Sequence, residues 1–376
     1  MALFGQGGPS SSQEVVRKGN LEFLSLRRNQ EEVEALLGSP QKRGSEDGIL
    51  VEWEYRRAVF DEVTGQPEAI ATVRAAAAGD GAFRLLPFYS YNVTPSEERN
   101  EDEAIRGDAF PGDSVLGLRT LSGQMVVPIG INSIGWHLRN ILGDPVTSGS
   151  TDFEHVFTAA AVPGIPMVTN SITHSRIGQH FVQDSLTCTS FEIAARKEGQ
   201  YSRATLNMLG RAEQGVGATV DATPVEYAPD PVPTGFQGKV LAQGAEAAEV
   251  TAFDMTLTSG VETDQESMNQ SPNAAGFESP RWGLTGNISA RFVDRTWYDY
   301  AANDTPVALA LELAIAANKG LTILIPDVRF AMTGVPVEGR GPISASFSFQ
   351  AMRPAAGQEF VTFTLANQTA DYANPV

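Results

Sequence analysis

The stretch LSGQMVVPIGINSIGWHLRNIL at residues 121–142 alternates apolar and polar positions like a β-strand, and then changes to the spacing of a short amphipathic helix. A second stretch, LTGNISARFVDRTWYDYAAN at residues 284–303, makes the same change. Each opens on Leu-Ser/Thr-Gly, and each places a Trp near the start of its helix. Strand-rich sequence follows both stretches, so we expect an internal repeat with this order of elements.

The composition of the 376-residue chain is typical of a folded protein with many short strands. Apolar residues make up 42% and charged residues 19%, while 36 Gly and 22 Pro residues supply frequent turns. A chain of this length buries a sizeable core without a metal or a disulfide. The expected fold class is mainly β, with short helices packed on the sheets.

We expect four segments: an N-terminal arm and helix-containing extension at 1–84, a first β unit at 85–211, a linker or flap at 212–238, and a second β unit at 239–376. In the extension, Asn20 caps a predicted helix at 20–37, and an alternating strand is predicted near 49–60. A two-stranded hairpin is predicted between Phe191 and Leu209.

The chain is strongly acidic, with a formal net charge of −18. This charge opposes attraction to nucleic acid or to an anionic membrane surface. The longest apolar-leaning stretch, at 306–326, is interrupted by polar and charged residues, and the N-terminus lacks a long apolar run. We therefore expect neither a membrane span nor a signal peptide.

No pattern of residues indicates catalysis or a bound cofactor. The sequence lacks a nucleophile elbow, a phosphate-binding Gly-rich loop and a zinc-binding His motif. Its four histidines, His137, His155, His174 and His180, have no ligand spacing, and the single Cys188 reads as a small buried apolar residue. We expect a non-enzymatic protein without catalytic, cofactor or metal residues.

A charged segment at 94–114 is the first candidate functional region. Its charged residues are Glu97, Glu98, Arg99, Glu101, Asp102, Glu103, Arg106 and Asp108. Such a run is typical of a solvated loop, and the alternative is a loop that makes contacts between subunits or between rings.

Three apolar residues are candidate anchors of the two predicted helices on the sheets. They are Trp136 and Leu138 in the first helix and Trp297 in the second. A sugar-binding role for the tryptophans is the alternative interpretation.

The order of these motifs resembles the tail tube proteins, or major tail proteins, of long-tailed, siphovirus-like bacteriophages. The stretches that carry the resemblance are RTLSGQMVVPIGINSIGWHLRNILGD, FEHVFTAAAVPGIPMVTNSITH, DSLTCTSFEIAARKEGQYSRATLNMLGRAE and WGLTGNISARFVDRTWYDYAAN. The resemblance covers about residues 85–353 and lies in the order of the motifs, whereas residues 1–84 match the family poorly.

The resemblance implies a tail-tube-type β-sandwich or barrel fold. It also implies a structural virion protein that self-assembles into stacked rings around a channel for DNA. With a true repeat, three chains supply six tube units, and otherwise the ring is a hexamer. The acidic composition then predicts an acidic channel from which DNA phosphates are repelled. The implied partners are further copies of the chain, a tape measure protein inside the tube, terminator and baseplate proteins at its ends, and DNA in passage without specific binding.

The resemblance also places the protein in the phage tail, assembled in the cytoplasm of the host bacterium. Two other functions remain open at this point. One is another ring-forming tail component, such as a tail terminator or a baseplate hub protein. The other is a carbohydrate-binding or carbohydrate-cleaving β protein, which would need paired carboxylates in a cleft with aromatic platforms.

Overall fold

The computed structural model describes residues 83–372, apart from 105–106, 108–109, 111, 161–163, 198–199, 228, 269, 279–280 and 336–342, together with the backbone of 16–17, 59–60 and 69–74. The chain divides into two compact units, Met1–Ala69 with His174–Gly178, and Ile70–Thr173 with Gln179–Val376. In the first unit, β1 (Val16–Arg17) pairs in parallel with β2 (Val59–Phe60). The helix predicted at 20–37 and most of the strand predicted near 49–60 lie outside the described residues.

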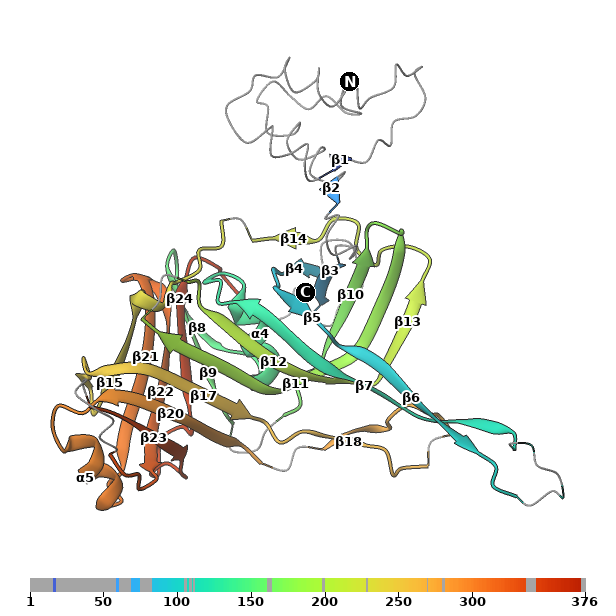
Figure 1. Cartoon of the computed structure of the whole chain (residues 1–376). Helices are drawn as coiled ribbons and strands as arrows, with labels where there is room; N and C mark the ends of the chain where they lie inside the picture. The colour runs from blue at the N-terminus through green and yellow to red at the C-terminus, as the bar shows by residue number, and fades with distance from the viewer. Residues whose placement is uncertain are drawn as a thin grey trace, which may run out of the picture. The chain divides into compact units, whose positions relative to one another are not determined.

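The second unit is built mainly from strands, which confirms the predicted fold class (Figure 1). Its first half contains β3 (Ala69–Arg74), β4 (Phe83–Leu85), β5 (Ser90–Tyr91), β6 (Thr94–Glu101), β7 (Ser114–Pro128), α4 (Ile134–Leu142), β8 (Val146–Gly149), β9 (Phe153–Thr158), β10 (Val168–His174), β11 (Gln179–Arg196) and β12 (Arg203–Gly210). The segment predicted as a linker contains β13 (Ala212–Val216), which pairs with the first part of β11, β14 (Val225–Glu226) and the 3-10 helix η1 (Gly235–Gln237).

The second half follows with β15 (Gly238–Ala242), β16 (Ala245–Glu246), β17 (Val250–Thr258), β18 (Glu262–Asp264), β19 (Gly276–Glu278), β20 (Gly283–Arg291), α5 (Thr296–Ala302), β21 (Val307–Ala316), β22 (Lys319–Phe330), β23 (Ser344–Ala351) and β24 (Thr362–Asn367). Both predicted strand-to-helix changes are present, as β7 with α4 and as β20 with α5. The hairpin predicted between Phe191 and Leu209 is also confirmed, because β11 and β12 pair there in antiparallel fashion.

Six antiparallel strands form one continuous layer across both halves, which we call the long sheet. Its order is β7-β12-β11-β17-β20-β23. A second antiparallel layer, the covering sheet, runs β8-β9-β24-β22-β21-β15-β16. The two layers are joined where the end of β22, at Val328–Phe330, pairs with β23.

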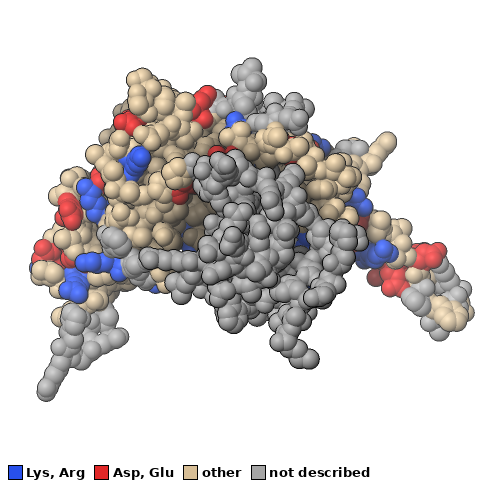
Figure 2. All heavy atoms as spheres, turned by 90° about the horizontal axis from the view of Figure 1, so that it is seen from above, with Lys and Arg blue, Asp and Glu red and all other residues tan. Residues whose placement is uncertain are grey.

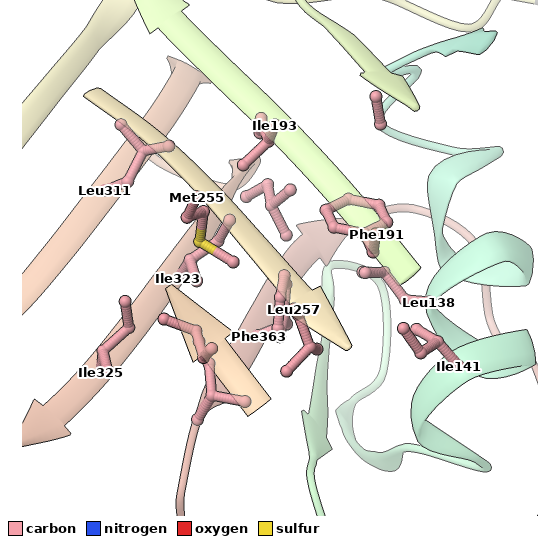
Figure 3. Close-up of a cluster of buried hydrophobic side chains, with 14 of the residues drawn as sticks. Leu138, Ile141, Phe191, Ile193, Met255, Leu257, Leu311, Ile323, Ile325 and Phe363 are labelled. Carbon is pink, nitrogen blue, oxygen red and sulfur yellow. The ribbon is translucent and has the colours of Figure 1, made fainter. Parts of the chain in front are cut away.

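The apolar core also runs without a break from the first half to the second. Figure 3 shows Leu138 and Ile141 of α4 beside Phe191 of the long sheet and Phe363 of the covering sheet. The rings of Phe191 and Phe363 meet edge to face, with centroids 5.7 Å apart. Met255 and other buried side chains of the second half continue the same cluster, so hydrophobic burial holds the halves together.

The two halves share one pairing pattern. In the long sheet, Gly123 of β7 lies opposite Met208 of β12, and Gly286 of β20 lies opposite Phe349 of β23. On the other side, Ser122 pairs with Thr94 of the preceding strand, and Thr285 pairs with Thr256. The segments that join each pair, 95–121 and 257–284, are almost equal in length.

Both glycines of the Leu-Ser/Thr-Gly openings are required by close backbone approach. A Cβ atom at Gly123 would lie 2.0 Å from the carbonyl oxygen of Asn92, and one at Gly286 would lie 2.2 Å from that of Asp254. In each half, the backbone of the preceding strand therefore occupies the space that any side chain would need.

The last described residue, Tyr372, is fully buried against α4. A Cβ atom at Gly135 would lie 2.4 Å from its ring, and the ring of Trp136 meets it edge to face at 5.6 Å. Its hydroxyl donates to the carbonyl oxygen of Asn132 at 2.8 Å and accepts from the side-chain amide of Asn367 at 2.6 Å. The segment that follows β24 thus completes the core of the first half.

We expect Gly286→Ala to destabilise the protein by about 1–3 kcal/mol, because its methyl group would overlap the Asp254 carbonyl and the Phe349 ring. Urea unfolding measures the change. Gly276→Ala in β19 is the matched control, since its Cβ atom would enter open space. Equal midpoints for the two variants would contradict this account of the glycine.

We expect stability to fall as the pH drops below the ordinary pKa of histidine, in part because of His137. Burial in α4 lowers the pKa of His137 to about 4, so the unfolded state takes up its proton first. Between pH 7.5 and 5.5 this single group costs about 1 kcal/mol. Urea midpoints at both pH values should differ less for His137→Leu than for the natural protein, and an identical pH dependence would refute the assignment.

Candidate assembly surfaces

The charged segment at 94–114 was predicted as a loop, and this prediction is wrong for its first eight residues, which form strand β6 of a hairpin. β6 pairs with β7 from Thr94 opposite Ser122 to Glu101 opposite Ser114, with a bulge between Glu97 and Arg99. We call residues 94–122 the arm; it runs out beyond the long sheet in Figure 1. β6 is exposed on both faces, so it has no apolar alternation from which a strand could be predicted.

The candidate charged residues lie along this arm. Glu97 pairs with Arg119 of β7 at 2.9 Å, and Arg99 donates to the hydroxyl of Ser114 at 3.3 Å. Glu101 accepts the backbone N–H of Gly112 at 3.0 Å. The remaining described members, Glu98, Asp102 and Glu103, are exposed, while Arg106 and Asp108 lie outside the described residues. Acidic and basic side chains both mark the arm at the right of Figure 2.

β7 also exposes apolar side chains where it forms the arm. Val115, Leu116 and Leu118 are 64%, 54% and 49% exposed. The same strand buries Leu121 and Met125 once it enters the long sheet. Several adjacent exposed apolar residues are typical of an interaction surface, so the arm has the composition of a contact element.

The exposed face of the long sheet is polar and poor in charge. Its outward side chains are mainly hydroxyl and amide groups: Ser122, Gln124, Thr205, Asn207, Ser190, Thr256, Thr258, Thr285, Asn287, Ser289, Ser344, Ser346, Ser348 and Gln350. The charged residues on this face are Glu192, Asp254, Arg196, Arg203 and Arg291. None of the six strands contains a lysine.

A third surface lies at the end of the second half, beside β20 and β23. Met332 and Met352 are 57% and 38% exposed, and Trp282 is half-buried. Arg281 and Arg353 are exposed next to them. We call these five residues the second-half edge, since they lie directly before β20 or shortly after β22 and β23.

The three predicted anchor residues are buried. Trp136 donates its indole N–H to the hydroxyl of Tyr227, and Leu138 packs in the core. Trp297 donates to a carboxylate oxygen of Glu249 at 2.9 Å, and its ring meets Phe330 of β22 at 5.5 Å. Each indole N–H is thus satisfied inside the fold, which leaves no aromatic platform at these two positions.

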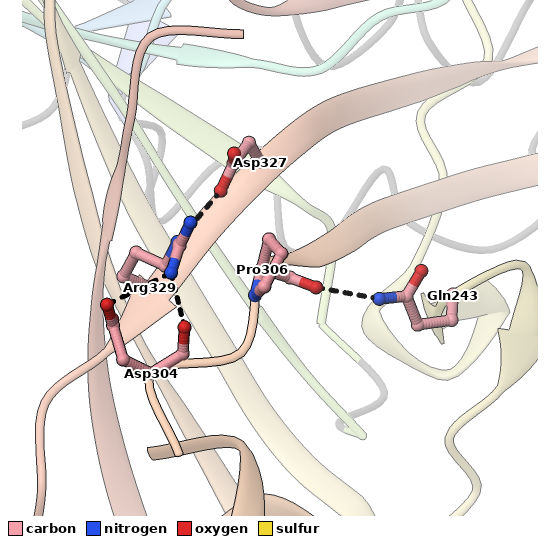
Figure 4. A network of polar contacts seen from close by, with 5 residues as sticks. All are labelled: Gln243, Asp304, Pro306, Asp327 and Arg329. Atoms are coloured by element: carbon pink, nitrogen blue, oxygen red, sulfur yellow. Dashed lines mark hydrogen bonds and ion pairs between the residues drawn. The ribbon is translucent and has the colours of Figure 1, made fainter. Parts of the chain in front are cut away.

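Arg329 fastens the turn that follows α5 to the sheet beneath it. Its guanidinium pairs with Asp304 at 3.0 Å and with Asp327 at 3.2 Å (Figure 4). Gln243 holds the end of the same turn by donating its side-chain N–H to the carbonyl oxygen of Pro306 at 2.9 Å. These contacts hold the connection between α5 and β21 beside the final residues of β22.

The described residues show no grouping of three or more His, Cys, Asp or Glu side chains that could hold a metal ion. Cys188 is buried, and burial raises the pKa of its thiol. No helix in this part of the chain is long and apolar enough to cross a membrane.

Comparison of the sequence with models of known protein families shows the family to which the chain belongs. A family model described as phage tail tube protein matches residues 59–351, which spans both strand-to-helix motifs. The chain belongs to the phage tail tube protein family. Among curated proteins, none matches it. As a tube protein it is a structural component of a phage tail.

Sequence reasoning located part of the tube protein's surfaces and missed the rest. The charge run identified the arm, although as a loop. The second-half edge was missed because Met332 and Met352 lie just beyond β22 and β23, where the apolar alternation of each strand has ended. The alternation of β23, with its serines at every second position, was the available signal for the polar face.

Proposed function

We propose that this tube protein self-assembles into stacked rings that enclose a channel, and that DNA passes through this channel to the host. Each ring contains three chains, because one chain supplies two tube units. The observation that supports this most directly is the shared register of the halves, with Gly123 and Gly286 at equivalent positions. Three copies of a two-unit chain give the six units of a pseudo-sixfold ring.

In this proposal the exposed face of the long sheet lines the channel. The long sheet crosses from one half to the other, as a closed inner wall requires, and ring closure pairs the edges that a single chain leaves open. Serine, threonine and amide side chains dominate this face. They offer DNA phosphates few cations with which to pair, so the DNA slides without being held.

The charges on this face do not support the acidic channel that the composition predicted. Two acidic residues, Glu192 and Asp254, stand against three arginines, Arg196, Arg203 and Arg291. The acidic surplus of the chain therefore does not lie on this face. We propose a neutral, hydroxyl-lined channel in place of an acidic one.

The same proposal includes the other members of a tail. A tape measure protein occupies the channel before DNA does, and terminator and baseplate proteins bind the two ends of the tube. Assembly takes place in the host bacterial cytoplasm. The support for these partners is family membership.

Negative-stain electron microscopy of the purified chain, with mass measurement on the same sample, tests the assembly. We expect rings or tubes with an open channel and a mass of three chains per ring. Six chains per ring would contradict the two-unit assignment, and single rings that never stack would favour a terminator or hub role. A monomer at high concentration, even when seeded with preformed tail tubes, would overturn the proposal.

Cysteine labelling tests which face lines the channel. Ser346→Cys lies on the exposed face of the long sheet, and Ala314→Cys lies on the exposed face of the covering sheet. In assembled tubes we expect a polymer-bearing maleimide to label Ala314→Cys and to spare Ser346→Cys, because it cannot enter the channel. Both should react in dispersed subunits, whereas buried Cys188 stays silent. If the two variants were labelled equally in tubes, the exposed face of the long sheet would not line the channel.

A further inference from the structure

The two halves of the chain meet at a junction with a defined geometry. β17 of the second half pairs with β11 of the first half, from Ser190 opposite Thr258 to Arg196 opposite Ala252. This pairing makes the long sheet continuous. It is a β-strand junction between two tube units of similar topology.

The segment between β17 and β20 strengthens this junction by crossing onto the first half. The backbone N–H of Arg119 donates to the carbonyl oxygen of Pro272 at 2.8 Å, and the guanidinium of Arg211 donates to that of Ala274 at 3.1 Å. Ala274 and Val261 of the crossing segment are buried. The second half thus covers the base of β7 with its own connecting segment.

The shared register identifies the equivalent positions in the other half. Gly123 corresponds to Gly286, so Arg119 of the first half corresponds to Trp282 of the second. Met208 corresponds to Phe349, so Arg211 corresponds to Met352. The arm of the first half corresponds to the crossing segment of the second. A repeated junction would therefore place the arm of a second chain against Trp282 and Met352.

The exposed apolar residues fit such a repeated contact. In the internal junction, the crossing segment buries Val261 and Ala274. The arm exposes Val115, Leu116 and Leu118, and the second-half edge exposes Met332 and Met352. Joining these surfaces would remove apolar area from water on both sides.

Charge on the two surfaces is complementary. The arm carries exposed carboxylates at Glu98 and Glu103. Arg281 and Arg353 flank the apolar residues of the second-half edge, and neither makes an ion pair or a hydrogen bond within the described residues. Opposite charges at a contact favour the correct partner and orientation.

The backbone at this edge is also open to pairing. Ala331 extends the pairing of β22 with β23 by one residue, because its N–H donates to the carbonyl oxygen of Ser348 at 2.8 Å, and residues 332–335 follow it. No strand pairs with their other side in the described part of the chain. In the first half, β17 occupies the equivalent side of β11.

We propose that the junction between neighbouring chains repeats the junction inside each chain. The arm of one copy lies on the second-half edge of the next, and residues 89–95 pair alongside 331–335. This inference rests on the proposed ring assembly and names the surfaces that close the ring. All six junctions of the ring then have one geometry, three within chains and three between them.

Charge reversal in the full chain tests the contact. Glu98→Lys with Glu103→Lys on the arm should reduce ring yield at least tenfold, and so should Arg281→Glu with Arg353→Glu on the edge. Combining all four changes restores opposite charges and should restore rings. Arg295→Glu with Lys319→Glu, which reverses two cations outside the contact, is the matched control and should leave the yield unchanged.

A disulfide between copies tests the placement. Leu116→Cys with Met352→Cys in one chain should form covalent trimers on oxidation, while either single variant should not. Rings that form in all charge variants, or a failure of rescue, would overturn this contact and leave the ring proposal standing. Disulfide-linked products of more than three chains would mean that the arm contacts a chain of an adjacent ring. Absence of rings in the natural protein would count against the proposed function itself.

Discussion

The hydrogen-bonded pairing of β11 with β17 is the interaction on which the rest of the described structure depends. It joins the two halves of the described chain into one long sheet. Because the strands alternate, this single register also aligns Phe191 with Leu257 on the core side and Glu192 with Thr256 on the exposed side. A shift by one residue would exchange the core and the polar face along the whole strand.

The sequence predicted those elements whose periodicity reflects burial on one face. β7, β20 and the β11·β12 hairpin alternate because one side packs on the core, and α4 shows helical spacing because it lies between the two sheets. β6 could not be predicted in this way, since neither of its faces is buried. Its pairing is imposed by β7, which carries the apolar pattern only after it enters the sheet. The helix predicted at 20–37 remains a prediction.

The polar face shows why net charge is a poor guide to a particular surface. A chain with a net charge of −18 carries an almost balanced set of charges on the long sheet. The excess of carboxylates lies on other parts of the chain, and the arm carries some of it. Composition sums over the whole molecule, whereas recognition depends on which side chains the strand register brings to one face. The face could be assigned only after the pairing partners were known.

The burial of Tyr372 makes the folding of the first half depend on a segment that follows most of the second half in sequence. β24 lies between β9 of the first half and β22 of the second, and Tyr372 fills the space beside Gly135. Both therefore follow most of the second half in sequence but complete the core of the first half. The first half cannot close its core as a separate folding unit, so the two halves must acquire their final packing together.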